Sequence, residues 1–348
     1  MFRTNGRWLL LFGLASGCDS ADRPELEPTT PGLTVDTLAS PAELPAQALS
    51  GGTVLPDGRL ALADLRAGTV WLVGPVRGAP ERLGTSGSGE GQISQPIGVT
   101  SFGDTIAVVS AGTARVDLFE HSGLHLGSLP LALALLSGPL ELLPSGHALV
   151  ATFGQDSALA ALRTLSGATL TRFGSSLVPA DQEIDPTAIK RSIRSGQVPG
   201  VFRDVVLPVG APDGSVWVVM HTEGIIQRYG PDGVLLATAT LPAAEVAPVR
   251  EEFFRANTDP DQPGAIHAYL LTASGVADSA GAWFLLASPP DRSAVLIRIG
   301  NDGSIGERLV IAESRGARLL LRDLNRDVFY LVHQEDGVVV RIRRAGAP

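Results

Sequence analysis

Short apolar runs recur along the chain, each after a turn that ends in glycine or aspartate. Six such stretches read "LPDGRLALAD", "SFGDTIAVVS", "LPSGHALVAT", "APDGSVWVVM", "SAGAWFLLAS" and "LNRDVFYLVH". The runs are rich in β-branched, leucine and aromatic residues and are only about six residues long, which favours strands over helices. The pattern therefore predicts a chain built from many short strands.

The turns that precede these strands recur at regular intervals. They are centred on Gly58, Asp104, Gly146, Gly214, Gly281 and Asp327, so the successive spacings are 46, 42, 68, 67 and 46 residues. Three of these spacings match a four-stranded propeller blade. In most repeats a second apolar strand and a glycine-bearing turn follow. Six repeats of strand and turn predict an all-β fold, a six-bladed β-propeller of four-stranded antiparallel blades.

The last repeat lacks a fourth strand, because the chain ends at Pro348 soon after "GVVVRIRR". The segment "GLTVDTLAS", Gly32 to Ser40, precedes the first full blade and has the composition of a strand. We expect this N-terminal strand to complete the last blade, which would leave no open edge in the ring.

The two long spacings contain insertions at 181–203 and 243–266. In the first, "DPTAIKRSIRSG" predicts a short helix with Asp185 as N-cap and Gly196 as terminator. In the second, "PVREEFFRAN" predicts another, with Glu251 and Arg255 spaced for an ion pair. Because strand directions alternate within a blade, both insertions should emerge on the face where the second strands end. That face is the candidate functional surface, unless the insertions are neutral decoration.

The glycine-rich stretch from Gly84 to Gly123 carries a family resemblance. Its "GSGEGQISQPIGV" followed by "GDTIAVVSAGTARVDLF" resembles one NHL-type repeat, a family that implies a propeller, commonly six-bladed. A phosphate-binding P-loop is disfavoured, since Gln92 and Ile93 lead into a strand and no lysine follows the glycines. We interpret the glycines as an inter-blade turn.

The N-terminus "MFRTNGRWLLLFGLASGC" has two arginines, a short apolar run and small residues before the only cysteine, Cys18. This order is typical of a secretory signal, and its apolar run is too short to span a bilayer. The segment resembles a bacterial lipoprotein precursor, which implies a lipid on Cys18 and a location in the cell envelope, facing the periplasm or the exterior. An ordinary signal peptide cleaved nearby is the alternative. We predict a signal peptide at 1–17, an acidic tether at 18–31 and a propeller at 32–348.

Composition narrows the possible partners. The formal net charge is −9 and Lys190 is the only lysine, so no basic stripe exists and nucleic acid is not expected as a partner. One cysteine excludes an intrachain disulfide and a CxxC metal site. Forty glycines and 25 prolines describe a turn-rich globular protein. We expect a monomer.

Polar residues stand six positions after several of the turn residues, at the predicted ends of second strands. We expect these residues to line the central channel, where a ligand could bind. The candidate binding residues are Asp64, Ser110, Thr152, His221 and His333. Propeller lactonases hold a divalent metal with acidic and amide side chains, and one carboxylate with two histidines does not resemble that set. We therefore predict no metal, no cofactor and no assigned catalytic residue.

Two functions remain open, because propellers host both. The first is an envelope-anchored protein that binds a peptide, protein or glycan on the face with the insertions. The alternative is a propeller enzyme of lactonase or lyase type, acting at the central channel through His221 or His333. Trp71, Trp217 and Trp283 fall at similar strand positions and are interpreted as core residues.

Overall fold

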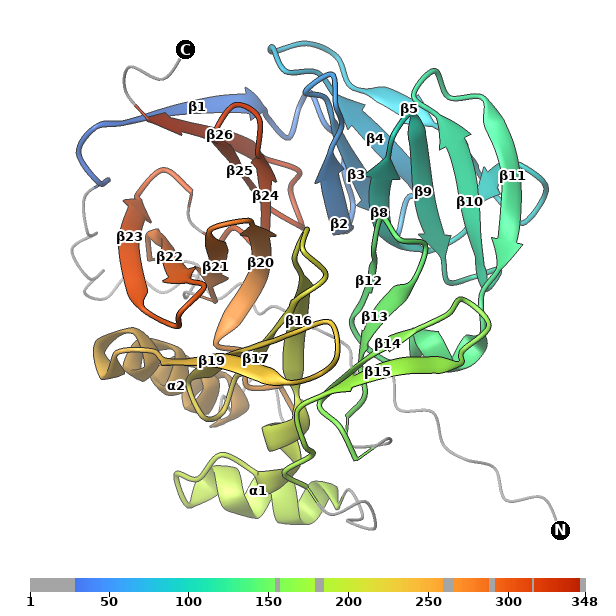
Figure 1. The fold of residues 1–348 in the computed structure, drawn as a ribbon. Helices are drawn as coiled ribbons and strands as arrows, with labels where there is room; N and C mark the ends of the chain where they lie inside the picture. The colour runs from blue at the N-terminus through green and yellow to red at the C-terminus, as the bar shows by residue number, and fades with distance from the viewer. Residues whose placement is uncertain are drawn as a thin grey trace, which may run out of the picture.

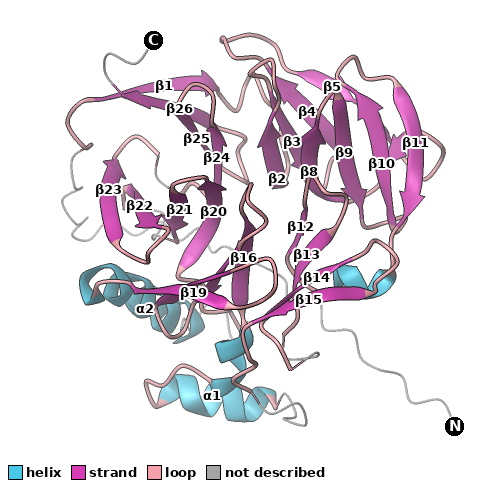
Figure 2. Ribbon diagram, in the orientation of Figure 1, coloured by secondary structure: helices cyan, strands magenta, loops and turns pink. Residues whose placement is uncertain are grey.

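Six four-stranded antiparallel sheets form a ring in the computed structural model, which describes residues 29–153, 157–178, 185–258, 266–287, 292–314 and 316–344. Figures 1 and 2 show these sheets around a central axis, with two α-helices on one side of the ring and a short helical turn beside another sheet. The innermost strands of neighbouring sheets contact one another all the way round. The predicted six-bladed β-propeller is therefore confirmed. The signal segment, Cys18 and most of the tether lie outside the described residues.

The first three blades follow the chain from the axis outward. Blade one contains β2 (Leu49–Val54), β3 (Leu60–Asp64), β4 (Thr69–Val73) and β5 (Glu81–Leu83). Blade two contains β8 (Pro96–Phe102), β9 (Thr105–Ser110), β10 (Arg115–Glu120) and β11 (His125–Pro130). Blade three contains β12 (Leu140–Leu142), β13 (Ala148–Ala151), β14 (Ala160–Arg163) and β15 (Thr169–Phe173), preceded by the 3-10 helix η1 (Leu133–Ser137).

The other three blades repeat this order. Blade four contains β16 (Val206–Gly210), β17 (Val216–Met220), β18 (Ile225–Tyr229) and β19 (Leu235–Thr240). Blade five contains β20 (Thr272–Asp278), β21 (Gly281–Leu286), β22 (Ala294–Gly300) and β23 (Ile305–Ile311). Blade six contains β24 (Leu319–Asp323), β25 (Val328–Val332), β26 (Val339–Arg344) and, as its outer strand, β1 (Leu33–Ala39).

The N-terminal strand closes the ring as predicted. β1 pairs antiparallel with β26, from Leu33 opposite Arg344 to Ala39 opposite Val339. Arg341 and Arg343 of β26 reach Asp36 at 3.1 and 2.8 Å. These guanidinium groups hold the pKa of the Asp36 carboxyl below its usual range. Closure therefore combines a strand ladder with charged side-chain contacts.

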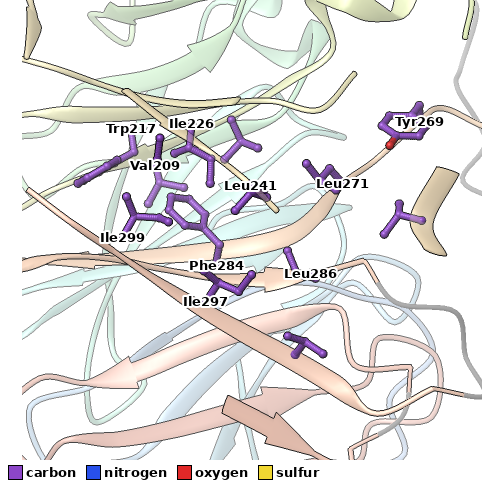
Figure 3. Packing of buried hydrophobic residues seen from close by; sticks show 14 of the residues in the cluster. Val209, Trp217, Ile226, Leu241, Tyr269, Leu271, Phe284, Leu286, Ile297 and Ile299 are labelled. Atoms are coloured by element: carbon purple, nitrogen blue, oxygen red, sulfur yellow. The ribbon is translucent and has the colours of Figure 1, made fainter. Parts of the chain in front are cut away.

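Six clusters of buried apolar side chains fill the boundaries between blades. Figure 3 shows the cluster between blades four and five, where Trp217 and Phe284 pack edge to face with their ring centroids 6.3 Å apart. Trp71, Trp217 and Trp283 are all buried, which confirms them as core residues. Each blade is thus stabilised mainly by its two neighbours.

The glycine-rich stretch is an inter-blade link, as interpreted from the sequence. It connects β5 to β8 and contains a short parallel ladder of β6 (Thr85–Ser86) with β7 (Gln92–Ile93). Arg115 donates to the backbone oxygens of Gly89 and Gln92, both at 2.6 Å. An arginine on the next blade therefore fixes the loop.

The two insertions contain the predicted helices, with one change of length. α1 (Pro186–Arg194) begins at Asp185, whose carboxylate accepts from the backbone N–H of Thr187 at 2.8 Å. α2 (Ala243–Thr258) begins five residues before the predicted start, so that Pro248 lies inside the helix. Arg255 pairs with Glu252 at 2.5 Å; the expected pair with Glu251 stays a prediction. Residues 181–184 and 259–265 of the insertions lie outside the described residues.

Candidate functional site on the insertion face

The two ends of the propeller differ in what they carry. We define the insertion face as the end of the propeller where each fourth strand links to the next blade and where α1 and α2 emerge. The turn face is the opposite end of the propeller. The turn after β17 contains Glu223 and Gly224. It lies on the insertion face, because it contacts both insertion links: Leu241, after β19, donates its backbone N–H to the Gly224 oxygen at 2.8 Å, and Arg203, before β16, pairs with Glu223 at 2.8 Å. The expected shared face is therefore present at blade four.

Both helices lie beside blade four and contact each other (Figure 1). α1 buries Ile189 and Ile193 in the cluster between blades four and five. α2 buries Val249 and Phe253 in the same cluster. The Phe253 ring packs edge-on against Phe202, of the 3-10 helix η2 (Gly200–Asp204), and against Tyr269, with centroid separations of 6.0 and 5.4 Å.

α2 is also held by charge to blade five. Glu245, near its first turn, pairs with Arg308 of β23 at 2.5 Å. At its other end, Asn257 accepts from the backbone N–H of His267 at 2.8 Å. The helix is therefore fixed at both ends and along its apolar side.

The apolar stripes of both helices are covered by the propeller itself. Their outer surfaces carry small apolar residues, such as Ala243, Ala244 and Ala247, together with polar and charged ones; the exposed charged residues are Arg191, Arg194, Arg250, Glu251 and Arg255. Within the described residues, no helix has the length and apolar character that crossing a membrane requires. The insertion face thus presents a rigid, charged helical surface.

Three of the five candidate binding residues are buried within their own blades. Asp64 accepts from the backbone N–H groups of Gln47, Ala48 and Ala67 and from Trp71 Nε1 at 2.9 to 3.2 Å. Ser110 donates to Asp117 at 2.7 Å, and Thr152 donates to the backbone oxygen of Ala158. These contacts satisfy the buried polar groups without a ligand, and a role in ligand binding stays a prediction.

His221 joins two blades. It ends the second strand of blade four, and its Nδ1 accepts from the backbone N–H of Leu271, just before β20, at 3.2 Å. The ring is 1% exposed, and burial lowers the pKa of His221 to about 3. His221 is therefore a neutral acceptor at ordinary pH.

His333 lies in a more polar position on blade six. Its Nε2 lies 3.3 Å from the Ser314 hydroxyl, and its Nδ1 lies 4.0 Å from Asp336. Burial is the main cause that lowers the pKa of His333, and Arg318 adds to it. Arg318 in turn experiences the charges of Glu335 and of Glu252 on α2. Arg318 thus feels charges from blade six and from α2 alike, and a ligand-binding role of His333 stays a prediction.

One carboxyl group at the axis was missed from the sequence. Glu141 belongs to β12, the innermost strand of blade three, and accepts from the backbone N–H of Gly210, on the innermost strand of blade four, at 2.8 Å. The residue as a whole is half-buried, but protein atoms surround the carboxyl group, and this burial raises its pKa to about 7. A carboxyl that titrates near neutrality can act as an acid or a base.

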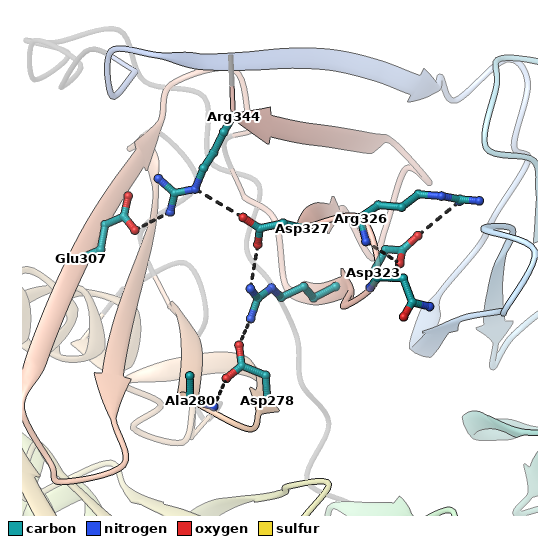
Figure 4. A network of polar contacts seen from close by, with 9 residues as sticks. Asp278, Ala280, Glu307, Asp323, Arg326, Asp327 and Arg344 are labelled. Carbon is teal, nitrogen blue, oxygen red and sulfur yellow. Dashed lines mark hydrogen bonds and ion pairs between the residues drawn. The ribbon is translucent and has the colours of Figure 1, made fainter. Parts of the chain in front are cut away.

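The charged side chains of the turn face pair with one another between blades five and six (Figure 4). Arg322 contacts Asp278 and Asp327, and Arg344 contacts Glu307 at 2.5 Å and Asp327 at 3.5 Å. This network joins the two blades.

Metal donors do not cluster in the described part of the chain. Among those residues, no three His, Cys, Asp or Glu side chains lie where they could hold a metal ion together. Glu141 and His221 are engaged with backbone N–H groups instead. The residues present do not fit a divalent metal of the lactonase kind.

Comparison with known proteins identifies the fold alone. No protein-family model and no curated protein sequence matches the chain. Among solved structures, an inactive variant of virginiamycin B lyase from Staphylococcus aureus with quinupristin is similar, at 13% identity and a TM-score of 0.51, over 89% of this chain and 99% of that one. Regucalcin from Agrobacterium tumefaciens, a calcium-binding protein, matches at 10% identity and 0.50, over 87% and 92%. A luciferin-regenerating enzyme matches at 10% and 0.53, over 90% and 96%.

Proposed function

We propose that this protein is a binding propeller of the bacterial cell envelope. It is held at the membrane by a lipid on Cys18, and it recognises a peptide, protein or glycan on the insertion face. The resemblance of residues 1–18 to a lipoprotein precursor supports the anchor and the location. A Cys18→Ser variant, which should leave the membrane fraction of cells, tests the anchor separately.

The observation that carries this proposal is the way α1 and α2 are fixed. Helices that decorate a loop at random need not bury apolar side chains in a core, whereas Ile189, Ile193, Val249 and Phe253 are all buried. The helix backbones from which the outer side chains project are therefore fixed, which removes the cost of ordering the backbone on binding. A rigid scaffold that presents charged side chains is a suitable recognition surface.

An enzyme remains the second candidate, and Glu141 is the residue that favours it. Two of the structures similar to this chain are a lyase and a luciferin-regenerating enzyme. An enzyme on this scaffold would use Glu141 as its acid or base in preference to His221, because the His221 ring is buried and its Nδ1 is occupied. Metal-assisted lactonase chemistry has less support, since the donor set is absent from the described residues.

Site-specific photo-crosslinking in intact cells tests the binding function. A photoreactive amino acid replaces Arg250 or Glu251, which are exposed on α2, and in control chains it replaces Arg82 or Arg172, which are exposed on outer strands of blades one and three. We expect a discrete adduct from the α2 positions and none from the controls. Equal adducts at all four positions, or none on α2, would contradict recognition on this face.

A further inference from the structure

The N-terminal segment meets the propeller on the insertion face. The Thr30 N–H donates to the backbone oxygen of Val310 at 2.9 Å, and the Thr30 hydroxyl accepts from the Val310 N–H at 2.8 Å. The Thr29 hydroxyl accepts from the backbone N–H of Ala312 at 3.0 Å and donates to Glu313 at 2.5 Å. Ala312 and Glu313 begin the link from blade five to blade six, and such links lie on the insertion face. The chain before Thr29 therefore starts from this face.

The length of that chain limits how far the propeller can lie from its anchor. Eleven residue steps separate Cys18 from Thr29, and a fully extended chain of this length reaches at most about 40 Å. A lipid on Cys18 would therefore hold the propeller close to the membrane, with the chain leaving it from the insertion face.

α1 has the charge that such a position requires. The helix contains Lys190, Arg191 and Arg194 and no acidic residue, although the chain as a whole carries a net charge of −9. Lys190 and Arg194 are four apart and Arg191 and Arg194 three apart, so they share one side of the helix. Arg191 and Arg194 are exposed, and Lys190 is half-buried. Ile189 and Ile193 hold the opposite side in the core.

We propose that the insertion face is turned toward the membrane and that α1 lies against anionic phospholipid headgroups. The orientation rests on the anchor proposed above, whereas the contact rests on the charges of α1. Charges are screened beyond about 8 to 10 Å at physiological salt, so acidic side chains far from α1 count little, and Asp185, exposed at its N-terminus, offsets only one of the three basic charges. Each basic residue near an anionic surface increases binding about fivefold. A ligand of α2 would then be met at the membrane surface.

The single lysine gives a direct test. The chain from Cys18 onward is coupled through the Cys18 thiol to a maleimide lipid in vesicles of phosphatidylcholine, with or without 30% phosphatidylglycerol. The rate at which a soluble amine-reactive ester acylates Lys190 is then measured by mass spectrometry. We expect this rate to fall roughly fivefold or more on the anionic vesicles only, and to recover in 0.5 M salt as the Debye length shrinks.

Two variants make the result specific. Arg191→Gln/Arg194→Gln removes the exposed charges and should restore fast acylation of Lys190 on anionic vesicles. Arg172→Lys places a reference lysine on the exposed outer strand of blade three, and its rate should not change. Unchanged acylation of Lys190, or equal slowing of both lysines, would overturn the proposal. This experiment uses purified chain and pure lipid, whereas the crosslinking experiment on α2 uses cells. A failure of the membrane contact can therefore be distinguished from a failure of ligand recognition.

Discussion

The carboxylate of Glu141 and the backbone N–H of Gly210 form a hydrogen bond of 2.8 Å between the innermost strands of blades three and four. A Cβ on Gly210 would lie 2.5 Å from Leu143 Cδ2, so that the leucine side chain would have to move, and at ordinary contact distance, 3.6 Å, from both Glu141 oxygens. The glycine thus lets Leu143 and the carboxyl group pack closely against the backbone of the next blade. Its desolvation raises the pKa of Glu141 to about 7, against an ordinary value of 4.5.

The first prediction concerns the pH dependence that Glu141 adds to stability. A carboxyl whose pKa is raised on folding contributes stability that is full below its unfolded pKa and is lost as the pH rises through its folded pKa. Between pH 4.5 and 7 this loss is about 1.4 kcal/mol per pH unit. Glu141→Gln, measured by urea unfolding, should therefore gain stability relative to the parent as the pH rises through this range. Glu251→Gln controls for the removal of one negative charge, and a constant difference between Glu141→Gln and parent would contradict the prediction.

The second prediction concerns closure of the ring by β1. Leu38 is 2% exposed and packs in the cluster between blades six and one, whereas Thr37 beside it is exposed. Leu38→Ala should lower the free energy of unfolding by about 2–5 kcal/mol, from lost burial and the cavity left behind. Thr37→Ala is the matched control and should change it far less. Equal and small effects of the two variants would mean that β1 contributes little to closure.

Sequence periodicity was sufficient to predict the ring because a propeller repeats one local pattern. Each second strand is an apolar run after a turn, and that signal survives in blades where the NHL-like residues are absent. Closure by β1 followed from counting strands in the last repeat. The start of α2 was wrong by five residues, because the predicted stretch "PVREEFFRAN" begins at Pro248, which lies inside the helix. Packing of Val249 and Phe253 offsets the hydrogen bond that this proline removes.

The candidate site was less predictable, since burial and pairing depend on residues far apart in sequence. Counting six positions from a turn located the ends of the second strands but not the groups that Asp64 or Ser110 contact there. Glu141 lies in a strand of only three residues, "LEL", with no apolar run to mark it. Its neighbour Gly210 is 69 residues away. No local pattern indicates such a contact between blades.

The last prediction concerns His221, whose titration opposes that of Glu141. A histidine whose pKa is lowered by burial contributes stability that is full above its unfolded pKa of about 6.5 and is lost as the pH falls toward its folded value of about 3. His221→Asn keeps an acceptor near the position of Nδ1, so the hydrogen bond from Leu271 can persist. Relative to the parent, this variant should gain about 1.4 kcal/mol for each unit of pH below 6.5.

Between pH 4.5 and 6.5 the two groups have slopes of similar size and opposite sign, so their contributions to the parent nearly cancel there, over a background that all four chains share and to which His333 contributes. Relative to the parent, Glu141→Gln alone should then lose stability as the pH falls, because the His221 contribution is no longer offset. His221→Asn alone should lose stability relative to the parent as the pH rises, for the converse reason, and the double variant should follow the parent profile. Urea unfolding of the four chains at pH 4.5, 5.5 and 6.5 measures this crossing, with His147→Asn as the control for loss of a histidine. Parallel profiles for the two single variants would show that at least one group is not buried in the folded state as described here.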